Sequence, residues 1–419
     1  MSLRLVLSCG LIVALTGCGA GARGGLPTGS GSVLPDATGG TRVASMTNAA
    51  APAFSILYDF AAGTDAQYPS TGLTPYLGSL YGTSEYGGAN GTGAVFSISP
   101  GGVESVVHSF GGSGDGYMPS TGLLSVYNGD IYGSTVFGGC VTGAKACPVG
   151  VTYALNKAGQ ERILHRFYLH PALADGRQPM GLIEYNGLLY GLTSSGGVFN
   201  NNANQGLGTA FEIDAGGTEN KLHDFGAPGD GYEPAGTLTP VNGLFYGATT
   251  RGGLYDAGTM FSMTASGTET VLYSFGAPGD AALPNGDITL YNGTLYGTST
   301  SGGKYNYGAF FRINVDGTNE QVLHSFSGRA DGLGPTHGLL MHNGHFFGTT
   351  YTSDLYNGDG VLYKMSLTGQ ETVLHTFQGP DGLNPNGDLI WFNGQIYGST
   401  HESTNGYGEV YWLRPDPRP

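Results

Sequence analysis

An internal repeat is the feature of this chain that most constrains its fold. Each unit closes on a short run such as Val-Leu-His-Ser-Phe, and the closing phenylalanines are Phe60, Phe110, Phe167, Phe225, Phe275, Phe326 and Phe377, spaced 50 to 58 residues apart. Repeats of this length with four short strands are typical of propeller blades. The sequence therefore predicts an all-β fold, a seven-bladed β-propeller with four-stranded antiparallel blades.

Each unit begins with a predicted hairpin. Six units carry Asn-Gly between two apolar runs, the strongest local signal for a two-residue type I′ turn, and the first unit has Leu77-Gly78 instead. In the second unit this turn joins a first strand over 123–127 to a second over 131–134. The second strand of every unit places a glycine after an aromatic residue, and we interpret these glycines as packing residues that let another backbone lie close. They are Gly82, Gly133, Gly191, Gly247, Gly297, Gly348 and Gly398.

The two ends of the repeat region predict how the ring closes. The first strand, over 55–60, reads as a fourth strand without a third strand before it, and the last, over 409–413, as a third strand without a fourth after it. Pairing the two would complete the seventh blade and remove exposed sheet edges. We therefore expect a propeller over 53–415, closed by the N-terminal strand.

The sequence before the propeller predicts a lipid anchor. Residues 1–17 read as a lipoprotein signal peptide, with Arg4 before a short apolar run and Leu-Thr-Gly before Cys18. Cys18 would carry the acyl chains, palmitate included, and 18–52 would be a flexible Gly/Ala/Ser/Thr/Pro tether. Gly19 favours the outer over the inner membrane as the location in the cell envelope, either periplasmic or surface-exposed. The alternative is an ordinary secretory signal in which the cysteine is incidental.

The net charge excludes one class of partner, and the cysteine content predicts a disulfide. A net charge of −15 disfavours nucleic acid as a partner. Cys140 and Cys147 are the only cysteines in the predicted propeller and share one insertion, so we expect a disulfide that staples this loop; a metal site is the weaker alternative, because no histidine accompanies the pair.

Two repeated polar residues invite a functional interpretation. An Asp-x-x-x-Pro element recurs between blades, from Asp65 to Asp381, and could describe calcium ligands, but each loop offers one carboxylate. We interpret the aspartate as a turn cap and expect neither metal nor cofactor. The recurrent histidine near the end of each unit, replaced by Tyr58 and Tyr273 in two units, likewise looks structural, because so many equivalents cannot all be a catalytic base.

Function in such a ring should come from residues that break the repeat. The connections from second to third strand and from fourth to first strand emerge on one face, and this face carries the irregular insertions. Exposed tyrosines on rigid loops suit a glycan or protein ligand, although they could equally be solvated loop residues. The candidate ligand-binding residues are Tyr86, Tyr117, Tyr232, Tyr255, Tyr305 and Tyr356.

The repeat resembles a known family, the Gloeo_Verruco tandem repeat of secreted and surface-anchored bacterial proteins. The resemblance covers residues 55–413 and depends on Leu-His-Ser-Phe, Asp-Gly-x-x-Pro, Asn-Gly-x-Leu-Tyr-Gly-Thr and Gly-x-Val-Phe-x-Ile. It implies repeat architecture and a location outside the cytoplasm, with the lipobox as the anchor here. It implies no activity and no catalytic residues.

Two hypotheses for the function follow. The favoured one is an extracytoplasmic lipoprotein whose propeller is a binding or assembly platform for a glycan or protein, without chemistry and with no catalytic residue assigned. The alternative is a carbohydrate-active enzyme, a polysaccharide lyase or glycoside hydrolase, that acts on the loop-rich face. A tight cluster of non-repeated titratable side chains at one mouth of the channel would favour the enzyme. The residues available for it are His170, Arg177, Glu233, Arg251, His337, His342, His345, His401 and Glu402.

Overall fold

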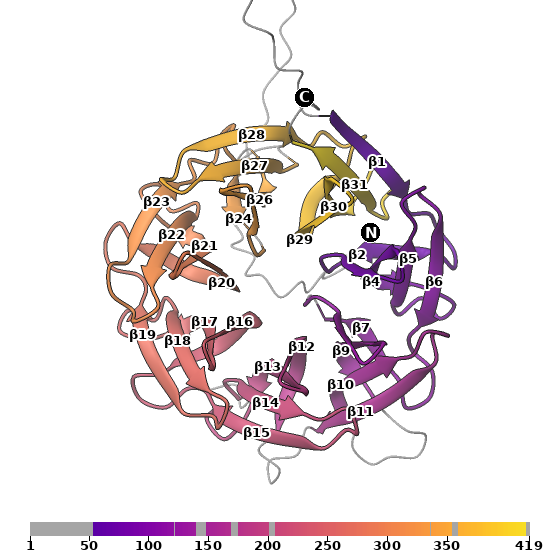
Figure 1. Cartoon of the computed structure of the whole chain (residues 1–419), viewed down its shortest axis with the longest axis horizontal. Coiled ribbons are helices and arrows are strands. Elements are labelled where there is room, and N and C mark those ends of the chain that lie inside the picture. The colour runs from indigo at the N-terminus through magenta and orange to yellow at the C-terminus, as the bar shows by residue number, and fades with distance from the viewer. Residues whose placement is uncertain are drawn as a thin grey trace, which may run out of the picture. The chain divides into compact units, whose positions relative to one another are not determined.

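A computed structural model describes residues 53–120, 122–139, 148–168, 175–200, 206–335, 337–353 and 359–415. These residues form seven antiparallel sheets around a central channel (Figure 1). The described ranges contain no helix. The predicted seven-bladed β-propeller is therefore confirmed. Among the described residues, no helix has the length and apolar character needed to cross a membrane.

The strands follow one another blade by blade from the channel outward. Blade 1 contains β2 (Ala66–Pro69), β3 (Thr74–Tyr76), β4 (Ser79–Gly87), β5 (Ala94–Ile98) and β6 (Glu104–Ser109); blade 2 contains β7 (Gly116–Pro119), β8 (Ser125–Tyr127), β9 (Asp130–Gly138), β10 (Pro148–Leu155) and β11 (Glu161–Tyr168). Blade 3 contains β12 (Gly176–Tyr185), β13 (Leu188–Gly196), β14 (Thr209–Ile213) and β15 (Glu219–Asp224); blade 4 contains β16 (Gly231–Val241), β17 (Leu244–Gly252), β18 (Thr259–Thr264) and β19 (Glu269–Ser274).

The remaining blades repeat this order, and the last one uses both ends of the ring. Blade 5 contains β20 (Ala281–Tyr291), β21 (Thr294–Gly302), β22 (Ala309–Asn314) and β23 (Gln321–Ser325); blade 6 contains β24 (Leu333–Pro335), β25 (Leu340–His342), β26 (His345–Thr352), β27 (Val361–Ser366) and β28 (Glu371–Thr376). Blade 7 contains β29 (Leu383–Phe392), β30 (Gln395–Glu402), β31 (Glu409–Arg414) and β1 (Ala53–Asp59).

Ring closure occurs as the sequence predicts. β1 pairs antiparallel with β31, with Phe54 opposite Leu413 and Ile56 opposite Tyr411. The pairing gives the third strand of blade 7 its missing outer neighbour and leaves no unpaired third strand at the seam. Ser403 and Asn405 add side-chain hydrogen bonds to Asp59 across the same seam.

The innermost strand is longer than the sequence pattern indicates. The prediction placed the first strand of blade 2 over 123–127, whereas it begins at Gly116 as β7 and continues as β8. In blade 4 the equivalent strand runs unbroken through Pro234, so the last part of Asp-x-x-x-Pro belongs to a strand rather than to a loop. A proline is tolerated there because one edge of this strand faces the channel and needs no ladder partner. A register shift between Ala235 and Thr239 breaks the alternation that would have revealed the strand.

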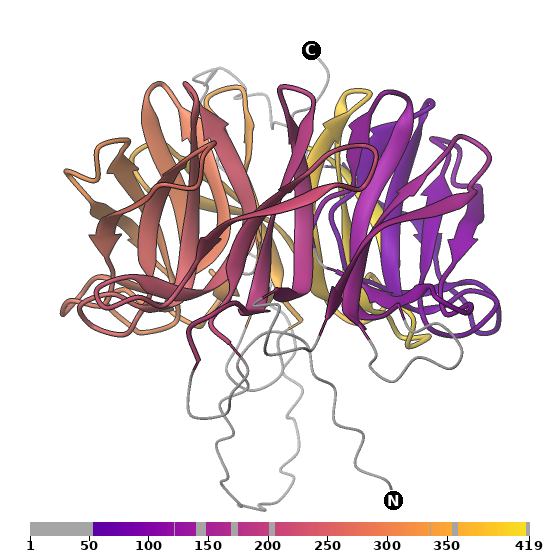
Figure 2. The same ribbon diagram turned by 90° about the horizontal axis from the view of Figure 1, so that it is seen from below.

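The predicted hairpin turns are confirmed in all seven blades. Both central residues have positive φ, as a type I′ turn requires, for example Asn128 at 49° and Gly129 at 83°. Leu77 adopts the same conformation, with φ 49°, although leucine tolerates it poorly. These tight turns lie on the upper side in Figure 2, and the wider connections lie on the lower side, called the loop face below.

The repeated glycines of the second strands do face close neighbours, but the neighbour is a side chain. Gly297 pairs with Phe311 across the sheet, and a Cβ built on Gly297 would lie 2.7 Å from Phe311 Cζ and 3.0 Å from Ile288 Cδ1. The same arrangement recurs in every blade, so an aromatic ring of the third strand covers each glycine. The expectation that another backbone lies close is therefore wrong, while the packing role is correct.

Apolar side chains fill the spaces between neighbouring blades. Seven core clusters of buried residues are present, one for each pair of neighbouring sheets. The cluster between blades 4 and 5, for example, joins Tyr246 and Phe275 to Ile288 and Phe311. Stability therefore depends on contacts between blades.

Replacing Gly297 by alanine should destabilise the propeller by about 1–3 kcal/mol, because the added methyl group overlaps the Phe311 ring. Urea denaturation measures this change. In a double-mutant cycle with Phe311→Leu, which removes the overlapped ring atoms, the two substitutions should couple by about 1 kcal/mol or more. Strict additivity would show that the ring does not confine this glycine.

Candidate functional site

The repeated polar residues meet on the outer rim, where each blade contacts the next. The outer strands follow one another around the circumference (Figure 1). At six of these contacts, one blade contributes a histidine or tyrosine and an aspartate. The next blade contributes a glutamate, which begins or immediately precedes its outer strand. We call each such set of three residues a junction cluster. The six are Tyr58–Asp65–Glu104, His108–Asp115–Glu161, His165–Asp175–Glu219, His223–Asp230–Glu269, Tyr273–Asp280–Glu320 and His324–Asp331–Glu371.

The seventh contact, between blades 6 and 7, departs from this pattern. His375 Nε2 lies 2.8 Å from Asp381 Oδ2, as a histidine–aspartate pair should. The position of the glutamate is taken by Phe54 of β1, whose ring stacks on the imidazole with centroids 3.6 Å apart. At this contact the described residues therefore place an aromatic ring, and not a glutamate, beside the histidine.

The aspartates cap the turns between blades, as the sequence indicates. Asp65 Oδ2 accepts from the Ala61 backbone N–H at 2.8 Å, and its Oδ1 accepts from the Ala66 N–H at 2.9 Å. Asp230 repeats this with the N–H groups of Gly226 and Gly231. Each carboxylate thus fixes the crossing that leads into the next blade.

Burial changes the protonation of the junction glutamates. It raises the pKa of Glu104 and Glu269 to about 7 and that of Glu320 and Glu371 to about 8. The pKa of Glu161 rises to about 9 through burial and its contact with Asp115. Each glutamate therefore holds a proton at higher pH than it would in the unfolded chain.

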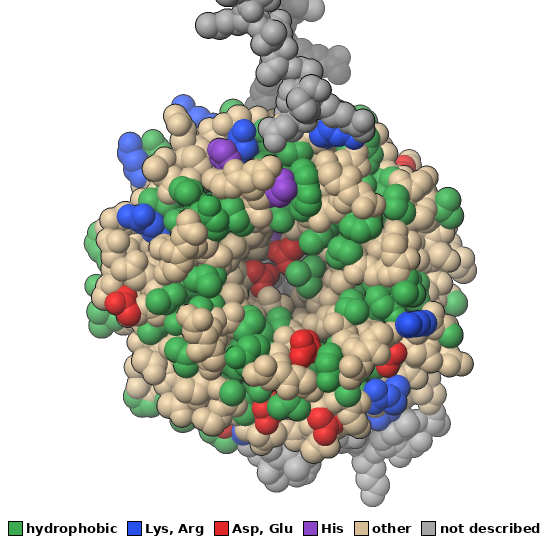
Figure 3. All heavy atoms as spheres, viewed as in Figure 1, with side chains coloured by type: hydrophobic (Ala, Val, Ile, Leu, Met, Phe, Trp, Pro, Cys, Tyr) green, Lys and Arg blue, Asp and Glu red, His purple; other side chains and the backbone are tan. Residues whose placement is uncertain are grey.

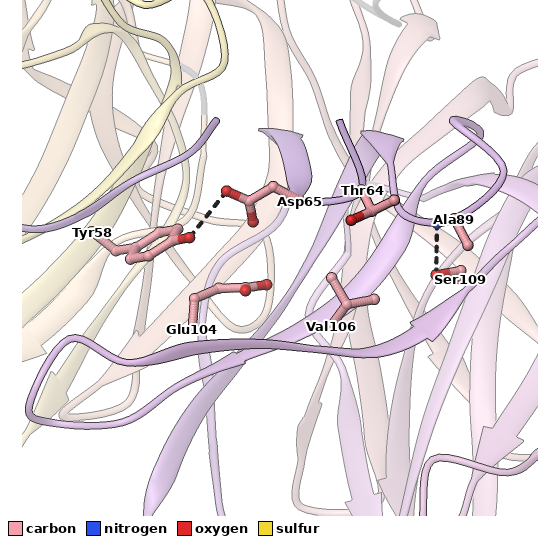
Figure 4. Close-up of a pocket in the computed structure, with 7 residues that line it drawn as sticks. All are labelled: Tyr58, Thr64, Asp65, Ala89, Glu104, Val106 and Ser109. Carbon is pink, nitrogen blue, oxygen red and sulfur yellow. Dashed lines mark hydrogen bonds between the residues drawn. The ribbon is translucent and has the colours of Figure 1, made fainter. Parts of the chain in front are cut away.

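One junction cluster is open to solvent through a shallow cavity of about 410 Å³. In Figure 4 the Tyr58 hydroxyl donates to Asp65 Oδ2 at 3.0 Å, and Glu104 lies beside them. The remaining lining residues are Thr64, Ala89, Val106 and Ser109. Because Tyr58, Asp65 and Glu104 recur in kind around the rim, this cavity is a feature of the repeat.

A second interlock between blades explains two more repeated residues. The residue before each repeated proline has positive φ, as in Tyr68 at 58°, and its N–H donates to the preceding blade, here to the Tyr407 carbonyl at 2.8 Å. The proline then packs on a repeated glycine of the preceding blade: a Cβ on Gly408 would lie 2.5 Å from Pro69 Cδ. The repeated Asp, Pro and Gly residues are therefore architectural.

The innermost segments of the seven blades contribute one residue each to a ring around the channel. Neighbouring members lie close together, as Gly122 does to Gly181 and Gly338 to Asp388, and the members are Gly72, Gly122, Gly181, Thr237, Asp287, Gly338 and Asp388. Five of the seven are glycine or threonine, and the two aspartates break the pattern. Figure 3, which views the face opposite the loop face, shows acidic side chains inside the central opening.

These two aspartates are held by neighbouring blades. Asp287 accepts from the Thr237 backbone N–H at 2.6 Å, and Asp388 accepts from the Gly338 N–H at 2.7 Å. Burial and the charge of Asp287 raise the pKa of Asp388 well above its usual range. Next to them His337 hydrogen-bonds to Asn386. The arrangement satisfies these groups within the wall of the channel.

The candidate functional site lies on the loop face, where titratable residues occupy one equivalent position in three consecutive blades. This position follows the repeated glycine of the second strand by three residues and holds Tyr351 in blade 6, His401 in blade 7 and Glu85 in blade 1. The other four blades carry Val136, Ser194, Thr250 and Thr300 there. Together with Glu402 and Tyr68, the three residues form what we call the mouth cluster.

His401 is the centre of the mouth cluster. Its Nε2 is buried without a hydrogen-bond partner and lies 3.7 Å from Glu85 Oε2, while its Nδ1 lies 4.0 Å from Glu402 Oε1. The Glu85 side chain is 9% exposed and that of Glu402 48% exposed. The Tyr68 ring packs near the imidazole, with centroids 5.2 Å apart. The imidazole therefore lies between a buried and an exposed carboxyl group.

Tyrosines surround this group. Tyr68 contacts Tyr86 and Tyr407 edge-on, with ring centroids 5.6 and 6.1 Å apart. Tyr351 is 44% exposed, and burial of its hydroxyl together with the charges of Glu402 and Glu85 raises its pKa. The mouth cluster thus combines aromatic surface with hydrogen-bonding groups.

The predicted tyrosines divide into several groups. Tyr86 is 38% exposed and belongs to the surroundings of the mouth cluster, whereas Tyr117 stacks on Phe137 and Tyr232 donates to Asp256. Tyr255 and Tyr305, 49% and 46% exposed, lie on the loop face in blades 4 and 5. Tyr356 lies outside the described residues, as do Cys18, Cys140 and Cys147.

Among the described residues, two of the non-repeated residues named for an enzyme, His401 and Glu402, meet in the mouth cluster. Arg177 and Arg251 belong to blades 3 and 4, and Glu233 receives a hydrogen bond from Thr250. His342 stacks on Trp391 and His345 bonds to its own hairpin, while His170 lies outside the described residues. The sequence analysis missed Glu85, Tyr68 and Tyr351. Aligning the seven second strands position by position would have identified Glu85 and Tyr351.

The chain belongs to the Gloeobacter/Verrucomicrobia repeat family, whose model matches residues 35–254, 141–357 and 241–418. The comparison with curated protein sequences finds no match.

Solved structures share the fold at low identity. A streptogramin B lyase structure matches with a TM-score of 0.55 and 14% identity, covering 86% of this chain and 97% of that one. A structure from a study of two prolyl endopeptidases matches with a TM-score of 0.50 and 12% identity, covering 84% of this chain and 51% of that one. At such identities the likeness shows the propeller fold alone.

The raised pKa of the junction glutamates predicts a pH dependence of stability. Glu320 stays protonated in the folded protein up to about pH 8, whereas in the unfolded chain it ionises near pH 4.5. Its contribution to stability is therefore full below pH 4.5 and is lost as the pH rises towards 8. Glu320→Gln, which mimics the protonated carboxyl, should match the wild type at pH 4.5 and be more stable than it at pH 9, as measured by urea denaturation in a chelating buffer. An equal difference at both pH values would contradict this account.

Proposed function

We propose that the propeller binds a glycan at the mouth cluster, as an extracytoplasmic platform. The observation that carries this proposal is the break in the repeat, which places Tyr351, His401 and Glu85 at one position of three consecutive blades. Aromatic rings supply a flat apolar surface for a sugar, and a few convergent polar groups orient it.

The charge of the mouth cluster narrows the ligand class. Two carboxyl groups, Glu85 and Glu402, lie beside His401, and both ion pairs of His401 in the described part of the chain are with these glutamates rather than with a lysine or arginine. With a chain net charge of −15, an acidic glycan would be repelled at this face. The ligand is therefore a neutral or amine-bearing sugar.

A second candidate function, glycoside hydrolysis, is favoured by one further observation. Glu85 and Glu402 contact opposite nitrogens of the same imidazole, so their nearest oxygens are no more than about 10 Å apart, which includes the separations that glycoside hydrolases use. Glu85 is the buried carboxyl and Glu402 the exposed one, an asymmetry that an acid and a base require. A lyase would need a cation to neutralise a substrate carboxylate, and among the described residues of the mouth cluster only a protonated His401 could serve as one.

A glycan-array screen of the purified chain tests binding, with mass spectrometry of every bound glycan to detect cleavage. Tyr86→Ala and Glu402→Gln should each weaken binding about tenfold, equivalent to about 1.4 kcal/mol. Tyr305→Ala is the matched control, because Tyr305 is also an exposed loop-face tyrosine but lies in blade 5. Equal losses in Tyr86→Ala and Tyr305→Ala would place the ligand elsewhere. Cleaved products that disappear in Glu85→Gln, with binding retained, would establish the enzyme instead.

The location in the cell envelope belongs to the same proposal and is supported by the sequence before the propeller, with Cys18 as the lipidated residue. Cys18→Ser should abolish incorporation of labelled palmitate and move the protein from the membrane to the soluble fraction, because two or more acyl chains are needed for stable anchoring. Cys9→Ser, within the signal sequence, is the control and should leave labelling unchanged. Unaltered labelling of Cys18→Ser would favour the ordinary secretory signal.

A further inference from the structure

The junction cluster between blades 5 and 6 has the composition of a metal site. His324, Asp331 and Glu371 each offer one ligand atom, and these atoms all lie within 4.8 Å of one another. His324 Nε2 is 3.6 Å from Asp331 Oδ2 and 3.7 Å from Glu371 Oε2. One imidazole and two carboxylates form a ligand set that suits zinc.

Buried polar atoms without a hydrogen-bond partner provide a second, independent indication of a metal site. The His324 Nε2 atom and one Glu371 carboxyl oxygen, Oε1, are buried without a hydrogen-bond partner, and the Glu371 side chain is 9% exposed. Buried polar atoms without a partner are costly, so such a group calls for an explanation. A cation between the three side chains would satisfy the imidazole nitrogen and the glutamate together.

The separations fit an ion better than direct hydrogen bonds. Distances of 3.6 and 3.7 Å are too long for a hydrogen bond from the imidazole. Ligands that each lie about 2.0–2.2 Å from one zinc ion are themselves separated by roughly 3–3.6 Å. A contraction of a few tenths of an ångström would therefore bring the two separations from His324 into the range of a zinc site.

Other contacts of the same ring show how a junction is satisfied without a metal. Between blades 4 and 5, Tyr273 occupies the place of the histidine, and its hydroxyl lies 3.1 Å from Asp280 Oδ2 and 3.4 Å from Glu320 Oε2. Between blades 6 and 7, His375 bonds directly to Asp381 and Phe54 covers its ring. These junctions satisfy the histidine or tyrosine through direct bonds.

A similar cluster exists between blades 1 and 2, but its charge is less favourable. His108 Nε2 is likewise buried without a partner, 3.5 Å from Asp115 and 3.9 Å from Glu161. The positive charge of Arg166 acts on Glu161, and such a charge opposes a second cation. In the clusters of His165 and His223 the imidazole lies 3.2 Å from its aspartate, within hydrogen-bond distance.

We propose that His324, Asp331 and Glu371 bind a zinc ion that joins blade 5 to blade 6. His324 and Asp331 come from blade 5 and its crossing, and Glu371 begins β28 of blade 6. The ion therefore cross-links two sheets that otherwise meet through apolar packing. The histidine side chain is 20% exposed, which leaves access for water as a fourth ligand.

The test uses the metal-stripped full chain, titrated with zinc by calorimetry and then desalted for metal analysis. His324→Tyr converts the cluster to the type found at Tyr273, so the variant should fold while losing one bound zinc per chain. His375→Tyr is the matched control and should bind as much zinc as the wild type. Zinc should also raise the melting temperature of the wild type more than that of His324→Tyr.

Glu371→Gln provides a second variant in case the tyrosine disturbs the junction. It keeps the shape of the side chain but removes the ligand charge, so it should also lose one zinc. Equal zinc content in the wild type, His324→Tyr and Glu371→Gln would overturn the proposal.

Discussion

The contact between one blade and the next is the interaction on which this structure depends. The apolar cores lie between the blades, because each core cluster is shared by two sheets. On the rim, the aspartate that caps the crossing lies beside a glutamate of the next blade at six of the seven contacts. The apolar contact supplies most of the stabilisation, and the polar contact fixes the angle at which the next sheet begins. Because the ring must close after seven such steps, small errors in this angle would accumulate.

The same repetition limits where function can reside. Backbone groups at equivalent positions of the blades bond to equivalent neighbours, as the positive-φ residue before each proline shows. The mouth cluster is different. The backbone at its position is the same as in the other blades, whereas the side chains there differ from blade to blade. Val136, Ser194 and Thr250 demonstrate that the fold does not require a titratable group there. The occurrence of three such groups in consecutive blades therefore reflects a demand other than folding.

Much of the architecture could be predicted from the sequence, because it depends on local rules repeated seven times. The Asn-Gly turns and the closure of β1 onto β31 are examples. The length of the innermost strands was underestimated. A residue with positive φ and a proline interrupt the alternation of apolar and polar residues in these strands, although backbone hydrogen bonding continues along one edge. For the repeated glycines, such as Gly297, the sequence analysis predicted a neighbouring backbone instead of an aromatic ring such as that of Phe311. The sequence of one strand does not reveal its register with the next strand, and this register determines which residue lies opposite the glycine.

The mouth cluster could be predicted only in part, for a geometric reason. Glu85 and His401 are far apart in the sequence and meet because blade 7 is followed in space by blade 1. Their contact exists only in the closed ring, at the seam where Asp59 bonds to Ser403 and Asn405 and where Tyr68 donates to Tyr407. The pairing of β1 with β31 is therefore more than a means of protecting a sheet edge. It also assembles the candidate site, so that the geometry of the mouth cluster depends on the same strand that completes the fold.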